Sequence, residues 1–382
     1  MKIVIAPDSF KGSISSMDAA LSIERGILHA YPQAETVLVP VADGGEGTME
    51  NLVAATGGHK TKVHVIDPLK KPFEAEFGVL GDQQTCIIEI AAASGLNLVS
   101  IGERNPLKAT TYGTGQLIKA ALDEGYRNFI LALGGSATND GGAGMLQALG
   151  VELKNSAGKE LDVGGGELGQ LQQLSTENFD PRIEESQFTI ASDVENPFVG
   201  PTGATYVFGP QKGATEAMVK VLDANLLHFA NKIEEKMGVR LHDSPGAGAA
   251  GGIGGAFQAF FPSTLRRGVD VVVEYARLEE QLENADLVIT GEGQVDFQTA
   301  YGKTPMGVAQ SAKAKNIPTI ILAGSYEGKI DSLYQYGVIG VYSVMNKPMT
   351  LDQAMKDASL LLEKTAEQVC RTYFFNRAGD SL

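Results

Sequence analysis

Short apolar runs, each followed by a loop of glycine and acidic residues, limit the fold of this chain more than any other feature of its sequence. Residues 2–6 form one such run, and the polar loop 7–13 follows it. Residues 36–41 form a second run, and the loop 42–48 follows it. Buried parallel strands have this apolar, β-branched composition. The pattern predicts an α/β fold with a Rossmann-like, doubly wound parallel sheet.

The same pattern returns near the C-terminus. Three runs there have the composition of buried strands: 285–290, 318–323 and 338–344. Residues 351–373 carry the apolar stripe of one long amphipathic helix. Because both ends of the chain follow the same pattern, we expect them to share one domain.

The middle of the chain differs, since residues 73–80 and 86–90 predict two paired strands around a tight turn. We therefore expect a discontinuous Rossmann-like domain formed by residues 1–65 plus 281–382. A second α/β domain, residues 66–280, is inserted into it and carries the glycine-rich loops.

Composition narrows the class of protein. The 382 residues are enough for two domains, and the formal net charge of −15 argues against nucleic acid or an anionic membrane as a partner. Two cysteines and five scattered histidines provide no disulfide framework and no zinc spacing. No segment approaches the roughly 20 apolar residues of a membrane span, and no signal-peptide pattern opens the chain. We expect a cytoplasmic protein.

The two N-terminal loops carry candidate substrate ligands. Asp8, Ser9 and Lys11 follow the first expected strand and precede a helix, where an anionic group would bind. A polar turn with a helix cap is an equally good interpretation. Asp43 and Glu46 lie in the second loop, among glycines that let the backbone approach a ligand, and could bind a hydroxyl or Mg²⁺.

The loop 134–144 is the most unusual segment, because it joins a strongly apolar strand to a helix through glycines and small polar residues. Such a loop can direct successive N–H groups at a phosphate, although it lacks the lysine of a P-loop. The candidate phosphate ligands are Gly134, Gly135, Ser136, Thr138, Asn139, Gly141 and Gly142. Asp140 could reach a metal, and Lys212, beside an expected helix start, could help to bind the nucleotide.

Asp193 and the segment around Lys303 complete the set of candidates. Asp193 follows an expected strand at 188–192 and could accept a proton from a hydroxyl or hold Mg²⁺; a turn aspartate is the alternative. Asp296 and Lys303 follow the strand 285–290, and Gly302-Lys303-Thr304 imitates the end of a P-loop without its first glycine.

A different function is indicated by residues 246–251, which fit the dinucleotide pattern GxGxxG with Asp270 at the expected distance. An NAD-dependent dehydrogenase of a small hydroxy acid is therefore the alternative. Its context is poor, because no clean apolar strand precedes the glycines.

Taken together, these segments resemble the bacterial glycerate kinase family (type 1). Eight of them occur in that family's order: DSFKG (8–12), DGGEGT (43–48), TYGTG (111–115), GGSATNDGGAG (134–144), SDV (192–194), QKGA (211–214), the glycine run 246–255 and GEG (291–293). The resemblance covers the chain up to about residue 375. It implies ATP-dependent phosphorylation of D-glycerate, mostly at the 2-hydroxyl. It also implies two α/β domains, one inserted in the other, with the active site in the cleft between them.

Our mechanistic hypothesis assigns a role to each candidate. The ATP phosphates bind the 134–144 loop with Lys212 or Lys303, and Mg²⁺ is bound by Asp193 and Asp43. Lys11 meets the carboxylate of glycerate, and Asp193 orients or deprotonates the attacking hydroxyl. Further substrate ligands are Asp8, Ser9, Asp43, Glu46, Asp296 and Lys303. ATP and D-glycerate are the expected partners, while a monomer and a homodimer both stay open.

Overall fold

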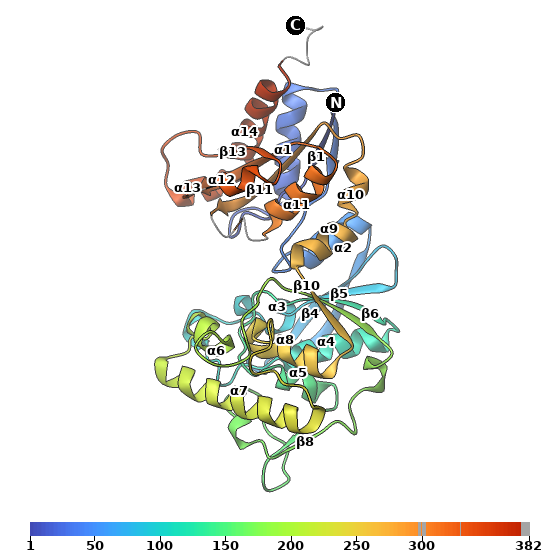
Figure 1. Cartoon of the computed structure of the whole chain (residues 1–382), viewed down its shortest axis with the longest axis vertical. Coiled ribbons are helices and arrows are strands. Elements are labelled where there is room, and N and C mark those ends of the chain that lie inside the picture. The colour runs from blue at the N-terminus through green and yellow to red at the C-terminus, as the bar shows by residue number, and fades with distance from the viewer. Residues whose placement is uncertain (297–298, 300–302, 329, 376–382) are drawn as a thin grey trace. The chain divides into compact units, whose positions relative to one another are not determined.

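The computed structural model describes residues 1–296, 299, 303–328 and 330–375, so Gly302 and the tail 376–382 lie outside the described residues. The chain folds into two compact units. Unit 1 comprises Met1–Asp43, Glu50–Ala55 and Val269–Leu382, and unit 2 comprises Gly44–Met49 and Thr56–Gly268. Each unit is an α/β structure with its own sheet (Figure 1).

Unit 1 contains a five-stranded parallel sheet in the order β13-β12-β11-β1-β2. Its strands are β1 (Lys2–Ile5), β2 (Glu35–Leu38), β11 (Leu287–Val295), β12 (Thr319–Tyr326) and β13 (Val338–Ser343). The strand order reverses between β1 and β11, and ligands of open α/β sheets bind at such a point, beyond the carboxyl ends of the strands.

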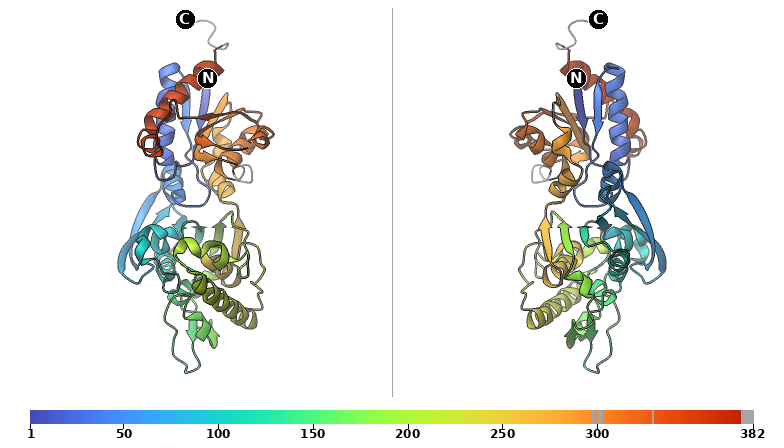
Figure 2. Two further views of the ribbon diagram at one scale, coloured as in Figure 1. Left: turned by 90° about the vertical axis from the view of Figure 1, so that its left-hand side faces the viewer. Right: turned by 90° about the vertical axis from the view of Figure 1, so that its right-hand side faces the viewer.

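Helices cover both faces of this sheet, as the doubly wound prediction requires. The helices of unit 1 are α1 (Ser16–Ala30), α9 (Gly268–Tyr275), α10 (Leu278–Gln281), α11 (Thr304–Ala314), α12 (Asp331–Tyr334), α13 (Leu351–Lys356) and α14 (Ala358–Tyr373). Helices α1 and α14 lie side by side (Figure 2), and their buried side chains cluster with Ile320 and Leu322 of β12. The alternate residues Ile321 and Ala323 cluster instead with residues of α11.

Unit 2 contains a six-stranded sheet in the order β10-β9-β6-β5-β4-β3, in which the first four strands are parallel and the last two pairs are antiparallel. Its strands are β3 (His59–Ile66), β4 (Pro72–Val79), β5 (Thr85–Glu89), β6 (Asn128–Ala132), β9 (Gln187–Ala191) and β10 (Ser263–Arg266). A separate hairpin pairs β7 (Glu152–Lys154) with β8 (Gln173–Ser175).

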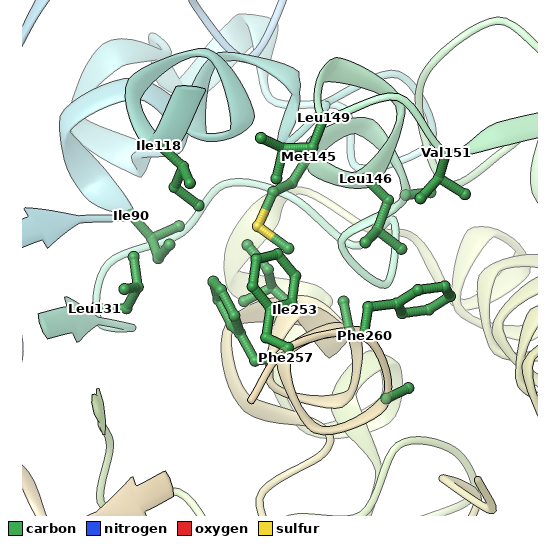
Figure 3. Close-up of a cluster of buried hydrophobic side chains, with 14 of the residues drawn as sticks. Ile90, Ile118, Leu131, Met145, Leu146, Leu149, Val151, Ile253, Phe257 and Phe260 are labelled. Carbon is green, nitrogen blue, oxygen red and sulfur yellow. The ribbon is translucent and has the colours of Figure 1, made fainter. Parts of the chain in front are cut away.

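The core of unit 2 lies between this sheet and its helices. These are α3 (Ala91–Ser94), α4 (Tyr112–Asp123), α5 (Ala143–Ala148), α6 (Ala204–Phe208), α7 (Glu216–Met237) and α8 (Ala249–Phe260). Figure 3 shows Met145 of α5 and Phe257 of α8 in this core, with Leu131 of β6 nearby. Helix α2 (Thr48–Thr56) begins in unit 2 and continues in unit 1.

The contacts divide the chain at positions that differ from the expected boundaries, 65/66 and 280/281. Strand β3 pairs with β4 along its whole length, so the residues after Thr56 group with unit 2. Helix α9 groups with unit 1 from Val269 onward, and Gly307 of α11 lies directly against the Val269 side chain.

Two local predictions need correction. The expected single helix 351–373 is two helices, because the chain leaves the helical conformation at Asp357, between α13 and α14. The glycine run 246–251 does not join a strand to a helix, since the preceding element is α7 and the run leads directly into α8. It therefore lacks the strand-turn-helix context of a dinucleotide fingerprint.

The glycines of this run are explained by close packing. Gly251 has a φ of +76°, and a Cβ there would collide with the carbonyl oxygen of Thr138. A Cβ on Gly252 would lie 2.8 Å from the Cα of Gly141. The glycine run thus packs directly against the backbone of the 134–144 loop. Among the described residues, no helix is long and apolar enough to cross a membrane.

Candidate functional site

Three carboxylates of unit 1 interact at the carboxyl edge of its sheet. Asp8 follows β1, Asp43 follows β2, and Glu292 lies in the second half of β11. The N–H of Asp8 donates to the carbonyl oxygen of Gly291 at 2.8 Å, which holds the loop after β1 against β11. This is the point at which the strand order reverses.

The helix beside Asp8 is α11 and not, as expected, the helix that follows β1. Helix α1 begins only at Ser16, and its N-terminus is capped by Ser15. The Asp8 carboxylate accepts hydrogen bonds from Thr304 Oγ1 at 2.5 Å and from the N–H of Ser9 at 2.6 Å. Because Thr304 is the first residue of α11, Asp8 lies at a helix N-terminus, which favours negative charge.

Burial nevertheless makes the charged form of two of these carboxyl groups unfavourable. It is the main cause that raises the pKa of Asp8 to about 7, and the negative charge of Asp43 raises it further. The hydrogen bonds from Thr304 and Ser9 act in the opposite direction. Burial likewise raises the pKa of Glu292 to about 7, against the effect of its hydrogen bond from Thr299.

Two hydrogen bonds and one ion pair link Glu292 to the start of α11. Thr299 Oγ1 donates to Glu292 Oε1 at 2.7 Å and accepts from the N–H of Asp296 at 3.2 Å. Lys303 Nζ lies 3.9 Å from Asp296 Oδ1. Lys303 is thus a nearby cation whose charge lowers the pKa of Glu292, although burial outweighs this effect.

Unit 1 therefore brings together most of the expected substrate ligands: Asp8, Ser9, Asp43, Asp296 and Lys303. The Lys11 side chain is exposed, and its N–H lies near Gly293 of β11. Glu46 is exposed and groups with unit 2. Sequence reasoning assigned no role to Glu292 or Thr304, and the only available signal was the GEG motif after an apolar strand.

The carboxyl edge of the unit 2 sheet holds a second group of loops. Glu89, at the end of β5, accepts a hydrogen bond from the N–H of Met49 at 2.8 Å and so anchors the start of α2. Asp193 follows β9, has an exposed side chain and accepts from the N–H of Gly268 at 3.1 Å. A Cβ on Gly134, just after β6, would lie 2.6 Å from the Cα of Gly45.

Most of the 134–144 loop is buried, and its polar groups form hydrogen bonds that stabilise the conformation of the loop. Asp140 is fully buried, and its carboxylate accepts four hydrogen bonds: from Thr111 N at 2.8 Å, Thr111 Oγ1 at 2.9 Å, Gly142 N at 3.2 Å and Gly144 N at 3.3 Å. Burial raises the pKa of Asp140 although these donors lower it. This carboxylate ties the loop to the N-terminus of α4.

Two other expected phosphate ligands, Gly141 and Asn139, also form hydrogen bonds within the protein. The N–H of Gly141 donates to the carbonyl oxygen of Gly251 at 3.0 Å, and Asn139 Nδ2 donates to Thr205 Oγ1 at 2.8 Å. In contrast, no hydrogen bond within the described part of the chain uses the N–H of Gly134 or Gly135. The candidate phosphate cradle is thereby narrowed to residues 134–136.

Lys212 lies beneath this cradle and not at the surface. It ends the 3₁₀ turn η5 (Pro210–Lys212), and only 2% of the residue is exposed. Its Nζ donates to Ser136 Oγ at 2.8 Å and to the carbonyl oxygen of Thr138 at 2.6 Å. Burial lowers the pKa of Lys212 to about 7, while the charge of Asp140 acts in the opposite direction.

No group of three His, Cys, Asp or Glu residues in the described part of the chain is arranged to hold a metal by itself. This agrees with the chemistry of Mg²⁺, which usually binds through one or two carboxylates and completes its shell with water and substrate phosphates. The exposed carboxylates Asp43 and Asp193 are donors of the required kind.

The chain is similar to known proteins along nearly its whole length. The model of the glycerate kinase family matches residues 3–374. A glycerate kinase of Bacillus subtilis (strain 168) is 48% identical, with 97% of each chain covered. A glycerate 2-kinase of Escherichia coli (strain K12) is also 48% identical, with 94% of each chain covered.

The fold is shared with a solved structure as well. A crystal structure assigned to glycerate kinase 2 of Salmonella typhimurium LT2 superposes with a TM-score of 0.89 at 45% identity, and 99% of each chain is covered. The kinases among these relatives are phosphotransferases, for which ATP is the implied phosphoryl donor. This chain belongs to the glycerate kinase family.

Proposed function

We propose that this chain transfers the γ-phosphoryl group of ATP to D-glycerate, with the 2-hydroxyl as the favoured acceptor. Support for the 2-hydroxyl comes from the name of one relative, the glycerate 2-kinase of E. coli. The observation that carries the proposal is the position of the polar loops, which follow the carboxyl ends of parallel strands in both units.

The two sets of loops suit the two charged substrates. In unit 2, the free N–H groups of Gly134 and Gly135 would donate hydrogen bonds to a phosphate of ATP, as successive backbone N–H groups do in other anion sites. Lys11 would meet the glycerate carboxylate, and Asp8, Ser9 and Lys303 would contact the substrate hydroxyls. Phosphoryl transfer requires mainly such positioning and charge neutralisation.

Asp193 is the proposed base that orients or deprotonates the attacking hydroxyl, because it is exposed and follows β9 directly. Asp8 is the second candidate. Its pKa, raised to about 7 chiefly by burial, is that of a base suited to neutral pH. The pH dependence of turnover in variants of each residue separates the two candidates.

Mg²⁺ fits the carboxylate donors of the chain, with Asp43 and Asp193 as its proposed ligands. When bound, the ion would neutralise charge on the transferred phosphoryl group. The protein's own contribution is to hold these carboxylates at strand ends, where the backbone is fixed by the sheet. Glu46 and Asp296 are proposed to bind substrate hydroxyls or water in the same region of their units.

The test is an ADP-release assay with D-glycerate, L-glycerate, D-lactate and glycolate as acceptors. We expect release with D-glycerate and far slower release with the other acids. Phosphorus NMR of the product identifies the acceptor: coupling to the single C2 proton gives a doublet, whereas a 3-phosphate couples to two protons. ADP release that does not depend on any of the acids would reject the proposal.

A further inference from the structure

Lys212 has surroundings that a lysine rarely has in a folded protein. A buried lysine is costly unless its charge is paired. In the described part of the chain Lys212 takes part in no ion pair, and its Nζ reaches only the neutral acceptors Ser136 Oγ and Thr138 O. These two acceptors match the two N–H donors of a neutral amine. An ammonium group would have a third N–H donor, for which no acceptor is present among the described residues.

The charged groups around Lys212 do not compensate for its burial. Asp140 is the carboxylate whose charge acts on Lys212, but four donors already occupy it. Arg104 contacts the same 3₁₀ turn, where its Nη1 donates to the carbonyl oxygen of Gln211 at 3.2 Å. In keeping with this geometry, burial lowers the pKa of Lys212 to about 7.

The two acceptors of Lys212 belong to the turn that forms the candidate phosphate cradle. Lys212 holds this turn from beneath through Ser136 and Thr138. On its other side the exposed Gly135, with a φ of +76°, and its neighbour Gly134 keep their N–H groups unused. Alternation of negative and positive φ at successive residues is the backbone arrangement of an anion-binding nest.

We propose that Lys212 is a positioning residue for the phosphates of the nucleotide, which fixes the 134–138 turn from beneath and takes up a proton when an anion binds to that turn. The inference rests on the proposed function, because the kinase reaction brings a polyphosphate to the cradle. An anion stabilises a nearby ammonium group. Binding of the anion is then linked to protonation of the buried amine.

Isothermal titration calorimetry of ADP with Mg²⁺ tests this coupling. At pH 8, an amine with a pKa of about 7 is about nine-tenths neutral. Titration in buffers of different ionisation enthalpy should show that the wild-type protein takes up more than half a proton per ADP bound. The variant Lys212→Met, which keeps Asp140, should take up almost none. The matched control Lys220→Met, an exposed lysine on α7, should behave as the wild type does.

Kinetics provide a second readout. Ser136→Ala removes one acceptor of Lys212 but keeps the lysine, and should raise the KM for ATP several-fold. Lys212→Arg should not restore the wild-type KM, because a guanidinium group stays protonated and does not fit the two acceptors.

Three results would overturn the inference: no proton uptake by the wild type, wild-type uptake in Lys212→Met, or an unchanged KM for ATP in Ser136→Ala. If Lys212→Met does not fold, the titration of the wild type and the kinetics of Ser136→Ala still test the inference. Failure of the proposed function looks different, because ADP would bind with proton uptake while no hydroxy acid elicited ADP release.

Discussion

The two units place polar loops at equivalent ends of their sheets but give their buried carboxylates different partners. In unit 1, Asp8, Asp43 and Glu292 repel one another, and burial raises the pKa of Asp8 and of Glu292 to about 7. In unit 2, the buried charge of Asp140 is surrounded by four donors and shapes a loop. Burial raises the pKa of Asp140 as well, so the units differ in the partners of their carboxylates: Asp140 accepts four hydrogen bonds that hold a loop, whereas Asp8 and Glu292 lie beside other carboxylates.

The largest effect is expected where unit 2 presents an exposed carboxylate. Asp193→Asn should lower kcat about a thousandfold without changing the melting temperature, because the amide cannot accept the proton of the hydroxyl. Glu195→Gln, two residues away and also exposed, is the matched control. Near-normal turnover of Asp193→Asn would move the base to Asp8 and so make unit 1 the catalytic side.

Removal of the carboxylate that shapes the unit 2 loop should unfold that loop. Asp140→Ala leaves four buried donors without their acceptor, so we expect a loss of about 3–5 kcal/mol in the free energy of unfolding. Urea denaturation measures it. Asp162→Ala, at an exposed ion pair with Lys70, should have almost no effect. Equal losses in the two variants would contradict a structural role of Asp140.

Neutralisation of the unit 1 carboxylates should raise the free energy of unfolding, whereas removal of Asp140 lowers it. A carboxyl group whose pKa is raised on folding binds its proton more tightly in the folded state. Its deprotonation therefore lowers the free energy of unfolding, and this loss is absent below pH 4 and complete above pH 7. Asp8→Asn and Glu292→Gln should each stabilise the protein at pH 8 by about 1 kcal/mol after allowance for solvent screening.

This gain should become much smaller when urea denaturation is repeated near pH 4.5. Glu327→Gln, an exposed carboxyl group of unit 1, serves as the control. Destabilisation of both variants at pH 8 would show that these carboxylates support the fold, as Asp140 does, and the contrast between the units would be lost.

The last expected effect concerns the metal. Asp43→Asn removes one proposed ligand and should raise the Mg²⁺ concentration for half-maximal turnover about tenfold. Glu50→Gln, exposed on α2 and also in unit 1, should leave that concentration unchanged. An unchanged Mg²⁺ requirement in Asp43→Asn would restrict metal binding to unit 2.

The positions of the strand-end loops could be predicted because composition changes abruptly there. Apolar runs end just before Asp8, Gly134 and Asp193, and the strands β1, β6 and β9 end within three residues of these positions. The prediction of an α/β fold with a doubly wound parallel sheet is confirmed by the sheet of unit 1 and by the similarity to the S. typhimurium crystal structure.

Other features depend on partners that lie far apart in the sequence. Thr304 meets Asp8 only because β1 pairs with β11, and nothing near Thr304 indicates this. The burial of Lys212 follows from the packing of a glycine loop, which composition does not reveal. Strand β3 was missed because exposed lysines and histidines alternate with its inward side chains, as at the edge of a sheet.

The pairing of β1 with β11 also has a consequence for synthesis on the ribosome. Ile3 is opposite Leu287, so the central strands of unit 1 meet only after 284 further residues have been added. At ordinary rates of translation this takes roughly 15 to 60 s. Unit 2 has all its strands by Arg266, so it can fold first while the parallel pair of β1 and β2 still lacks its neighbouring strand β11. A nascent chain stalled after Gly268 should therefore resist protease in unit 2 and be cleaved before Asp43.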